Sequence, residues 1–167
     1  MPDEPYPETI EVIYNETIRQ YDLLVNSLDG LNNKSIGIIA FNGTLLSLSS
    51  LSIVQIIKET TSNLQIFLFT IAIFYILILI SITFAAIAYR VVTIQTVNPH
   101  ILHEEYYLDK KKDVLDQLCS NIAEDIDKNQ EHSKRKSILI NHSLLFSVIG
   151  VITACISLMY GYSLVPW

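Results

Sequence analysis

Charge is scarce in this sequence. Charged residues make up 17% of its 167 residues and hydrophobic residues make up 50%, whereas an average soluble domain carries about 25% charged residues. The formal net charge is −6, so the chain has no basic surface with which to bind the phosphates of a nucleic acid. These two shortages argue against a soluble domain and against a nucleic-acid partner.

Cysteine and the common catalytic motifs are scarce too. Cys119 lies in a polar segment and Cys155 in an apolar one. Two such residues cannot form a disulfide framework, and they suit a reducing compartment. The sequence contains no nucleophile motif, phosphate-binding glycine loop or metal-ligand array of known spacing. We therefore expect a protein that is not an enzyme and that needs no cofactor.

Residues 64–89 contain no charge, no proline and no glycine. About 26 helical residues extend over about 39 Å, more than the hydrocarbon thickness of a bilayer, about 30 Å. A helix that is apolar on every side is buried in a large protein or crosses a membrane, and a chain of this length favours the membrane. This segment is predicted to be the central transmembrane helix.

Two further apolar runs are long enough to cross a bilayer. They occupy residues 36–57 and 138–160, about 22 residues each, which suffices for a span. The sequence therefore predicts an all-α integral membrane protein with three transmembrane helices. The expected divisions are an N-terminal amphipathic helix (1–34), a first span (35–57), a second span (64–90), a helical connection (99–137), a third span (138–161) and a short tail (162–167).

The polar segments before the first and third spans show helical periodicity. Apolar or weakly polar residues recur every three or four positions, as expected for one buried face of a helix. Gly30 interrupts the first pattern only mildly, and no glycine or proline interrupts residues 109–149. Both helices are expected to continue into the spans that follow them. The residues of the first face are Tyr14, Thr17, Tyr21, Leu24, Leu28 and Leu31.

Small residues form a line along each of the two outer spans. In lipid, small side chains allow helix backbones to approach closely, and dispersion then favours association. We predict that both lines pack against other helices. The first line is Ala40, Gly43, Ser47 and Ser50, and the second is Ser143, Ser147, Gly150, Ala154, Ser157 and Gly161.

A few polar side chains lie inside the predicted spans. Asn42 lies about two turns inside the first span, whereas Asn141 and His142 lie about one turn inside the third. Such groups need a partner or water. Together with Ser147 they are predicted either to form hydrogen bonds between helices or to line a pore, and both alternatives remain open. Lys134, Arg135 and Lys136 precede the third span and are expected to bind anionic lipid headgroups.

One segment contains residue types that bind metals. His100 and His103 are three residues apart, so they share a helix face, and Glu104 follows them. The chain offers no clear fourth ligand. Two histidines beside the membrane surface are therefore expected, and no metal site.

The basic residues predict an orientation. With three spans, the N-terminal segment and the long connection lie on the same side, and they carry ten of the eleven Lys and Arg residues. Lys58 is the exception. Cytoplasmic loops are enriched in Lys and Arg, so the N-terminus and the connection are predicted to be cytoplasmic, in a cell inner (plasma) membrane, with the C-terminus external.

The layout resembles a family of prokaryotic membrane modules. Residues 28–35 read LDGLNNKS, with an acidic residue and a lysine before a glycine-bearing span, and Lys128 and the 134–136 cluster lie in a charged linker before the last span. This arrangement is similar to the transmembrane module of Pycsar-type anti-phage effectors. The resemblance implies an effector that responds to a cyclic nucleotide and damages the inner membrane.

The leading functional hypothesis is a homo-oligomer that forms a pore or perturbs the lipid bilayer. The alternative is a non-catalytic scaffold or adaptor whose cytoplasmic helices bind a partner protein. An integral-membrane enzyme is a third and weaker hypothesis, because the sequence shows no cluster of polar groups directed at one site.

Overall fold

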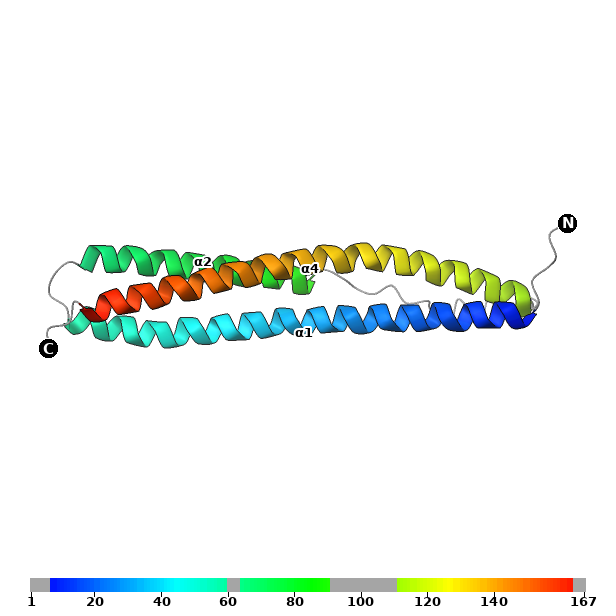
Figure 1. Cartoon of the computed structure of the whole chain (residues 1–167), viewed down its shortest axis with the longest axis horizontal. Helices are drawn as coiled ribbons and strands as arrows, with labels where there is room; N and C mark the ends of the chain where they lie inside the picture. The colour runs from blue at the N-terminus through cyan, green and yellow to red at the C-terminus, as the bar shows by residue number, and fades with distance from the viewer. Residues whose placement is uncertain (1–6, 60–63, 91–110, 164–167) are drawn as a thin grey trace. The chain divides into compact units, whose positions relative to one another are not determined.

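The computed structural model describes residues 7–59, 64–90 and 111–163, and all of them are helical. The helices are α1 (Pro7–Glu59), α2 (Leu64–Arg90) and α4 (Lys111–Ser163) (Figure 1). All three are long and apolar enough to cross a membrane. The prediction of an all-α protein with three membrane-spanning helices is confirmed.

Helices α1 and α4 each combine a polar and an apolar half. Each is a single helix of 53 residues, and neither ends where the polar sequence changes to apolar sequence. Gly30 lies within α1 without ending it, because one interior glycine costs only about 1 kcal/mol relative to alanine. The apolar halves are the predicted first and third spans.

The chain divides into two compact units. The described part of the first unit consists of residues 7–30 of α1 and 111–134 of α4. The described part of the second unit consists of residues 31–59 of α1, the whole of α2, and residues 135–163 of α4. The first unit contains the polar halves and the second contains the three spans.

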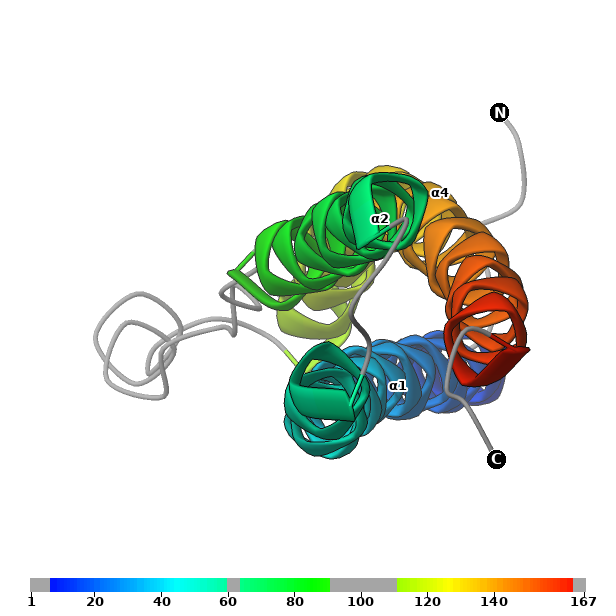
Figure 2. The same cartoon turned by 90° about the vertical axis from the view of Figure 1, so that its left-hand side faces the viewer.

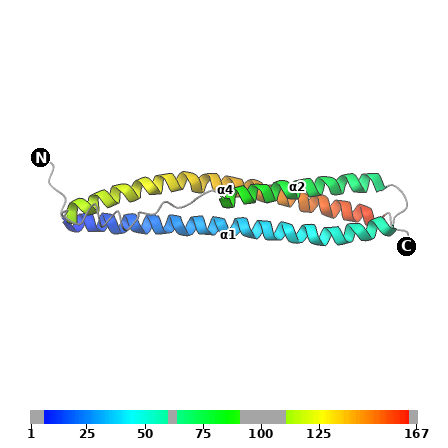
Figure 3. The ribbon, with the colours of Figure 1, turned by 180° about the vertical axis from the view of Figure 1, so that it is seen from behind.

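In the first unit the two polar half-helices lie side by side (Figures 1 and 3). Ile10 and Leu28 of α1 and Ile126 of α4 are buried, together with the polar side chain of Asn129. The other predicted face residues of α1 in this unit, Tyr14, Thr17, Tyr21 and Leu24, are half-buried. The face read from the sequence is thus the protected face of this half-helix.

The outer surface of the first unit carries exposed ion pairs within single helices. Arg19 donates to Glu16 at 2.7 Å, and Lys128 lies 2.7 Å from Glu124. The hydrogen bond from the Arg19 guanidinium lowers the pKa of Glu16 to about 2. The Lys128 ammonium likewise lowers the pKa of Glu124. Because all four groups are exposed, these pairs add little to stability.

In the second unit the three spans form a bundle, seen end-on in Figure 2. Helices α1 and α4 run in the same direction and α2 runs opposite to both (Figure 1). One apolar cluster is built on Ile38, Ala85, Ala88 and Ile140, and the other on Ile53, Ile56, Phe67 and Ile71. These two clusters, the buried Phe74 and Ile78 of α2, and the polar residues between the clusters make up the core of this unit.

The buried positions of each span recur at alternating steps of three and four residues. Such a seven-residue repeat is the pattern of left-handed helical packing. On α2 the repeat is Phe67, Ile71, Phe74, Ile78, Ser81, Ala85 and Ala88. The opposite faces expose large apolar side chains, for example Leu51 at 72% and Phe69 at 68%, as expected of helices surrounded by lipid.

Candidate functional site

The polar groups of the second unit meet at the middle of the bundle. Asn42 of α1 is fully buried, and its Nδ2 donates to Ser81 Oγ of α2 at 2.9 Å. Its Oδ1 accepts a hydrogen bond from Ser147 Oγ of α4 at 2.7 Å. One amide therefore connects all three spans.

A second pair of hydrogen bonds joins α2 to α4 at the same level. Ser81 Oγ donates to the carbonyl oxygen of Ser143 at 2.7 Å, and Ser143 Oγ donates to the carbonyl oxygen of Ser81 at 2.7 Å. Each hydroxyl has one proton, so these two bonds use both. The 3.1 Å separation of the two Oγ atoms is then a close approach, and Ser81 Oγ remains free to accept from Asn42.

We call Asn42, Ser81, Ser143 and Ser147 the core network. Their relative exposures are 0%, 0%, 0% and 4%. An unsatisfied polar group in hydrocarbon costs several kcal/mol, and here every side-chain oxygen has a partner. The network therefore joins the three helices through hydrogen bonds, and Asn42 and Ser147 both take part in it.

Small residues of α4 close the interior beyond the core network. An added Cβ on Gly150 would lie 2.8 Å from Ile78 Cδ1, and one on Gly161 would lie 2.7 Å from Phe67 Cε2. Ser143, Ser147, Gly150, Ser157 and Gly161 are buried, and Ala154 is half-buried. The predicted small-residue line of α4 therefore contacts α2 within the monomer.

The predicted small-residue line of α1 lies elsewhere. Ala40, Ser47 and Ser50 are exposed, and Gly43 is half-buried with open space around the position of a Cβ. The hydroxyls of Ser47 and Ser50 donate to the carbonyl oxygens of Gly43 and Ser47 of their own helix, at 3.0 and 2.7 Å. Within the part of the chain that the structure describes, most of this face is exposed and the hydroxyls of Ser47 and Ser50 have partners, so it suits contact with lipid or with another helix.

The predicted headgroup cluster is divided. Lys134 and Arg135 are exposed, whereas Lys136 is 1% exposed and its Nζ donates to Asn32 Oδ1 of α1. Ser35, also buried, donates to the carbonyl oxygen of Leu31 at 3.0 Å. Lys136 is thus buried in the bundle beside Asn32, whereas Lys134 and Arg135 are exposed.

Asn141 and His142 do not join the core network. Both are exposed, and His142 Nδ1 lies 2.8 Å from the carbonyl oxygen of Ile138. A carbonyl only accepts, so that nitrogen carries the proton. The His142 ring also lies near Phe84 of α2, with centroids 5.9 Å apart.

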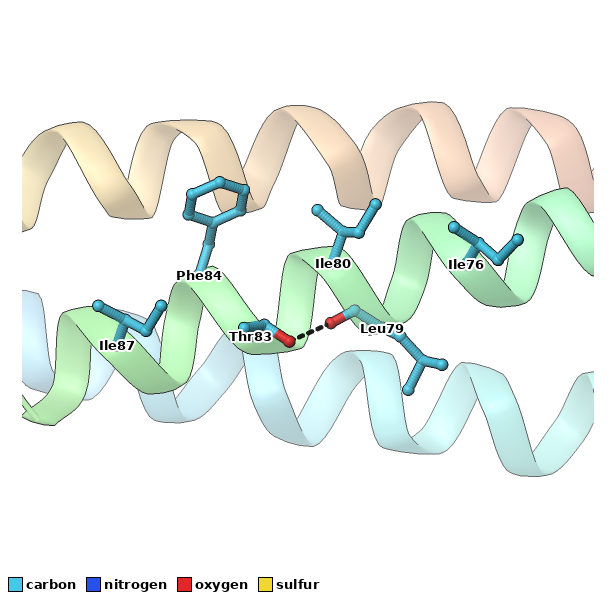
Figure 4. Close-up of a pocket in the computed structure, with 6 residues that line it drawn as sticks. All are labelled: Ile76, Leu79, Ile80, Thr83, Phe84 and Ile87. Atoms are coloured by element: carbon cyan, nitrogen blue, oxygen red, sulfur yellow. Dashed lines mark hydrogen bonds between the residues drawn. The ribbon is translucent and has the colours of Figure 1, made fainter.

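Helix α2 has an apolar hollow of about 320 Å³ on its outer face. Thr83 is one of its lining residues, and its hydroxyl donates to the carbonyl oxygen of Leu79 at 2.8 Å (Figure 4). Phe84 stacks on Phe146 of α4, with centroids 5.7 Å apart. The hollow thus offers a ligand no free polar group, and its lining is Ile76, Leu79, Ile80, Thr83, Phe84 and Ile87.

The sequence analysis did not identify Ser81 or Asn32 as members of these contacts. It also did not predict that Lys136 faces inward. Ser81 occupies one step of the buried repeat of α2, between Ile78 and Ala85. A search for polar residues at core positions of that repeat would have found it. His100, His103 and Glu104 lie outside the described residues. Among residues 7–59, 64–90 and 111–163, no three His, Cys, Asp or Glu side chains gather as metal ligands do.

The chain matches a known protein family. The family model described as PycTM, Pycsar effector protein domain, matches residues 17–161. No curated protein and no solved structure matches the chain. The match includes all three spans and most of both polar half-helices.

Proposed function

Because the chain belongs to the family of Pycsar effector protein domains, we propose that it is a membrane effector of anti-phage defence that acts by assembling copies into a bilayer-perturbing pore. Its site of action is the inner membrane, with the N-terminus and the long connection in the cytoplasm. That orientation follows from the ten basic residues of those segments.

The observation that carries the proposal is the closed interior of the spans. The core network leaves no unsatisfied side-chain oxygen, and Ile78 fills the space beside Gly150. A bundle of three helices packed in this way has no room for hydrated ions. Permeation therefore requires a path between copies, or a bundle that opens.

The exposed small-residue face of α1 is the best candidate for contact between copies. Gly43 has no atom within 4 Å of an added Cβ, so a second helix can approach its backbone. Small residues at such spacing favour helix association in lipid.

Gly43→Leu tests the proposal with little risk to the monomer, because the leucine enters open space. We expect the variant to lose both its oligomeric size in nanodiscs and its dye release from liposomes. Gly30→Leu is the matched control, since it makes the same change, also into open space, outside the spans. If wild-type protein is monomeric, or if Gly43→Leu keeps both properties, assembly through this face is wrong.

A scaffold function is the second candidate, and one observation favours it. Val12, Ile13 and Leu23 on the polar half of α1 are exposed at 68%, 51% and 56%. Large apolar side chains outside the spans suit binding to another protein. Wild-type protein that assembles but releases no dye would favour this candidate over the pore.

A further inference from the structure

A groove runs between α1 and α4 at the end of the bundle where the first span begins. Its volume is about 440 Å³, which lies within the range of small-ligand clefts, about 300–1,000 Å³. Lys34 is the only charged residue of its lining. The other lining residues are Gly37, Ile38 and Phe41 of α1 and Leu144, Ser147 and Val148 of α4.

A second hollow, of about 180 Å³, continues the groove between the same two helices, and Phe74 of α2 also lines it. Its residues follow those of the first at seven-residue steps, as in Lys34, Phe41 and Leu48, so both hollows lie on one side of the helix pair. From residue 34 to residue 52, α1 rises about 27 Å. The two hollows together therefore lie at the depth of the lipid chains.

The residues that line the groove favour an apolar occupant. Ser147 is its only uncharged side chain with a polar group, and that hydroxyl already donates to Asn42. That hydrogen bond also holds α1 and α4 together at the floor of the groove. A helix about 10 Å wide could not enter between them, whereas a single hydrocarbon chain could.

Lys34 favours an occupant that carries a negative charge. Its side chain is exposed, lines the groove, and has no hydrogen-bond or ion-pair partner among the residues that the structure describes. A lysine at the end of a span extends its ammonium to the headgroup level while its methylene groups stay in the apolar layer. Lys136 differs, because its ammonium is bound to Asn32.

We propose that this groove binds one acyl chain of an anionic phospholipid, whose phosphate pairs with the ammonium of Lys34. The site is a selective lipid site on each protomer, and it requires neither a pore nor assembly. It is separate from the exposed Lys134 and Arg135.

Native mass spectrometry of the full chain in detergent, with added phosphatidylglycerol or phosphatidylcholine, measures this site directly. We expect wild-type protein to keep one phosphatidylglycerol per protomer in preference to phosphatidylcholine. Lys34→Gln should reduce that preference about fivefold, equivalent to about 1 kcal/mol for one lysine at an anionic surface. Lys58→Gln, at the opposite end of the first span, removes the same charge and should leave the preference unchanged.

Gly37→Leu tests the apolar part of the site. Gly37 lines the groove and has no atom within 4 Å of an added Cβ, so the leucine should fill the groove without disturbing the fold. We expect binding of both lipids to fall, with Gly30→Leu unchanged. Equal binding of the two lipids by wild-type protein, unchanged binding by Gly37→Leu, or a change in oligomer size without loss of lipid would overturn the proposal. The last result would assign the groove to a second copy.

Discussion

At the scale of single residues, Asn42 shows how one polar side chain can organise a membrane bundle. It accepts from Ser147 on α4 and donates to Ser81 on α2, so its removal deprives two other helices of a partner. A leucine of similar size would leave the Ser147 hydroxyl buried without its acceptor. The cost of such a change comes from the groups left behind more than from the bond that is lost.

We therefore expect Asn42→Leu to destabilise the bundle by about 1–2 kcal/mol. Losing a buried hydrogen-bond partner in a protein and losing a hydrogen bond between membrane helices both cost about this much. Thermal unfolding in detergent, followed by circular dichroism, measures the effect. Asn141→Leu is the matched control, because Asn141 is exposed and outside the core network. Equal melting temperatures for the two variants would show that the network does not support the fold.

Glu16 provides a test at low pH. Its pKa is lowered from 4.5 to about 2, so its contribution to the stability of α1 is complete above the unfolded-state value. That contribution is lost as the pH falls from about 4.5 toward 2. Melting curves of wild type and Glu16→Gln should diverge above this window and converge below it. The difference should be small, since the pair is fully exposed, and a difference that grows as the pH falls would contradict this assignment.

At the scale of the helix, the two small-residue lines have similar composition and different surroundings. Gly150 lies against the buried Ile78, whereas Gly43 faces open space. The lines differ because Gly150 occupies the buried repeat of α4, while the buried repeat of α1 passes through Ile38, Asn42 and Ser49. Small side chains mark a close helix contact on α4 and, among the described residues, a mostly exposed face on α1.

Gly150→Leu should consequently destabilise the monomer itself. The new side chain would meet Ile78 at 2.8 Å from its first atom, and overpacking of this kind costs about 1–3 kcal/mol. Thermal unfolding of detergent-solubilised protein would measure the loss, and Gly43→Leu would serve as the control. Equal stability of the two variants would mean that α4 does not approach α2 as closely as described.

At the scale of the whole molecule, orientation in the membrane is the property that follows most directly from the charges. With residues Thr61 and Lys111 on opposite sides, Thr61→Cys should react with an impermeant thiol reagent added outside intact cells, and Lys111→Cys should not. Both changes are made after Cys119 and Cys155 are replaced by serine, and labelling of lysed cells confirms that each thiol is reactive. The opposite pattern would invert the proposed topology.

Much of the fold follows from the sequence alone because the bilayer accepts only long apolar segments whose backbone polar groups are hydrogen-bonded. A segment without charge over residues 64–89 has to cross it, and the periodic spacing from Tyr14 to Leu28 has to protect one helix face. These constraints act on each segment independently of its neighbours. They predict the three spans and their helical extensions. The resemblance to the Pycsar effector module depends on residues 28–35 and on the charged linker before the last span, and the family match confirms that resemblance.

Which polar groups meet depended on the tertiary structure. Composition does not distinguish Asn42, which joins three helices, from the exposed Asn141. It also does not distinguish the buried Lys136 from its exposed neighbour Arg135. The deciding quantities are the rotation of each helix about its axis and its register against the other two. A helix shows different residues to its neighbours with every 100° of rotation, and only packing against the other helices selects one rotation.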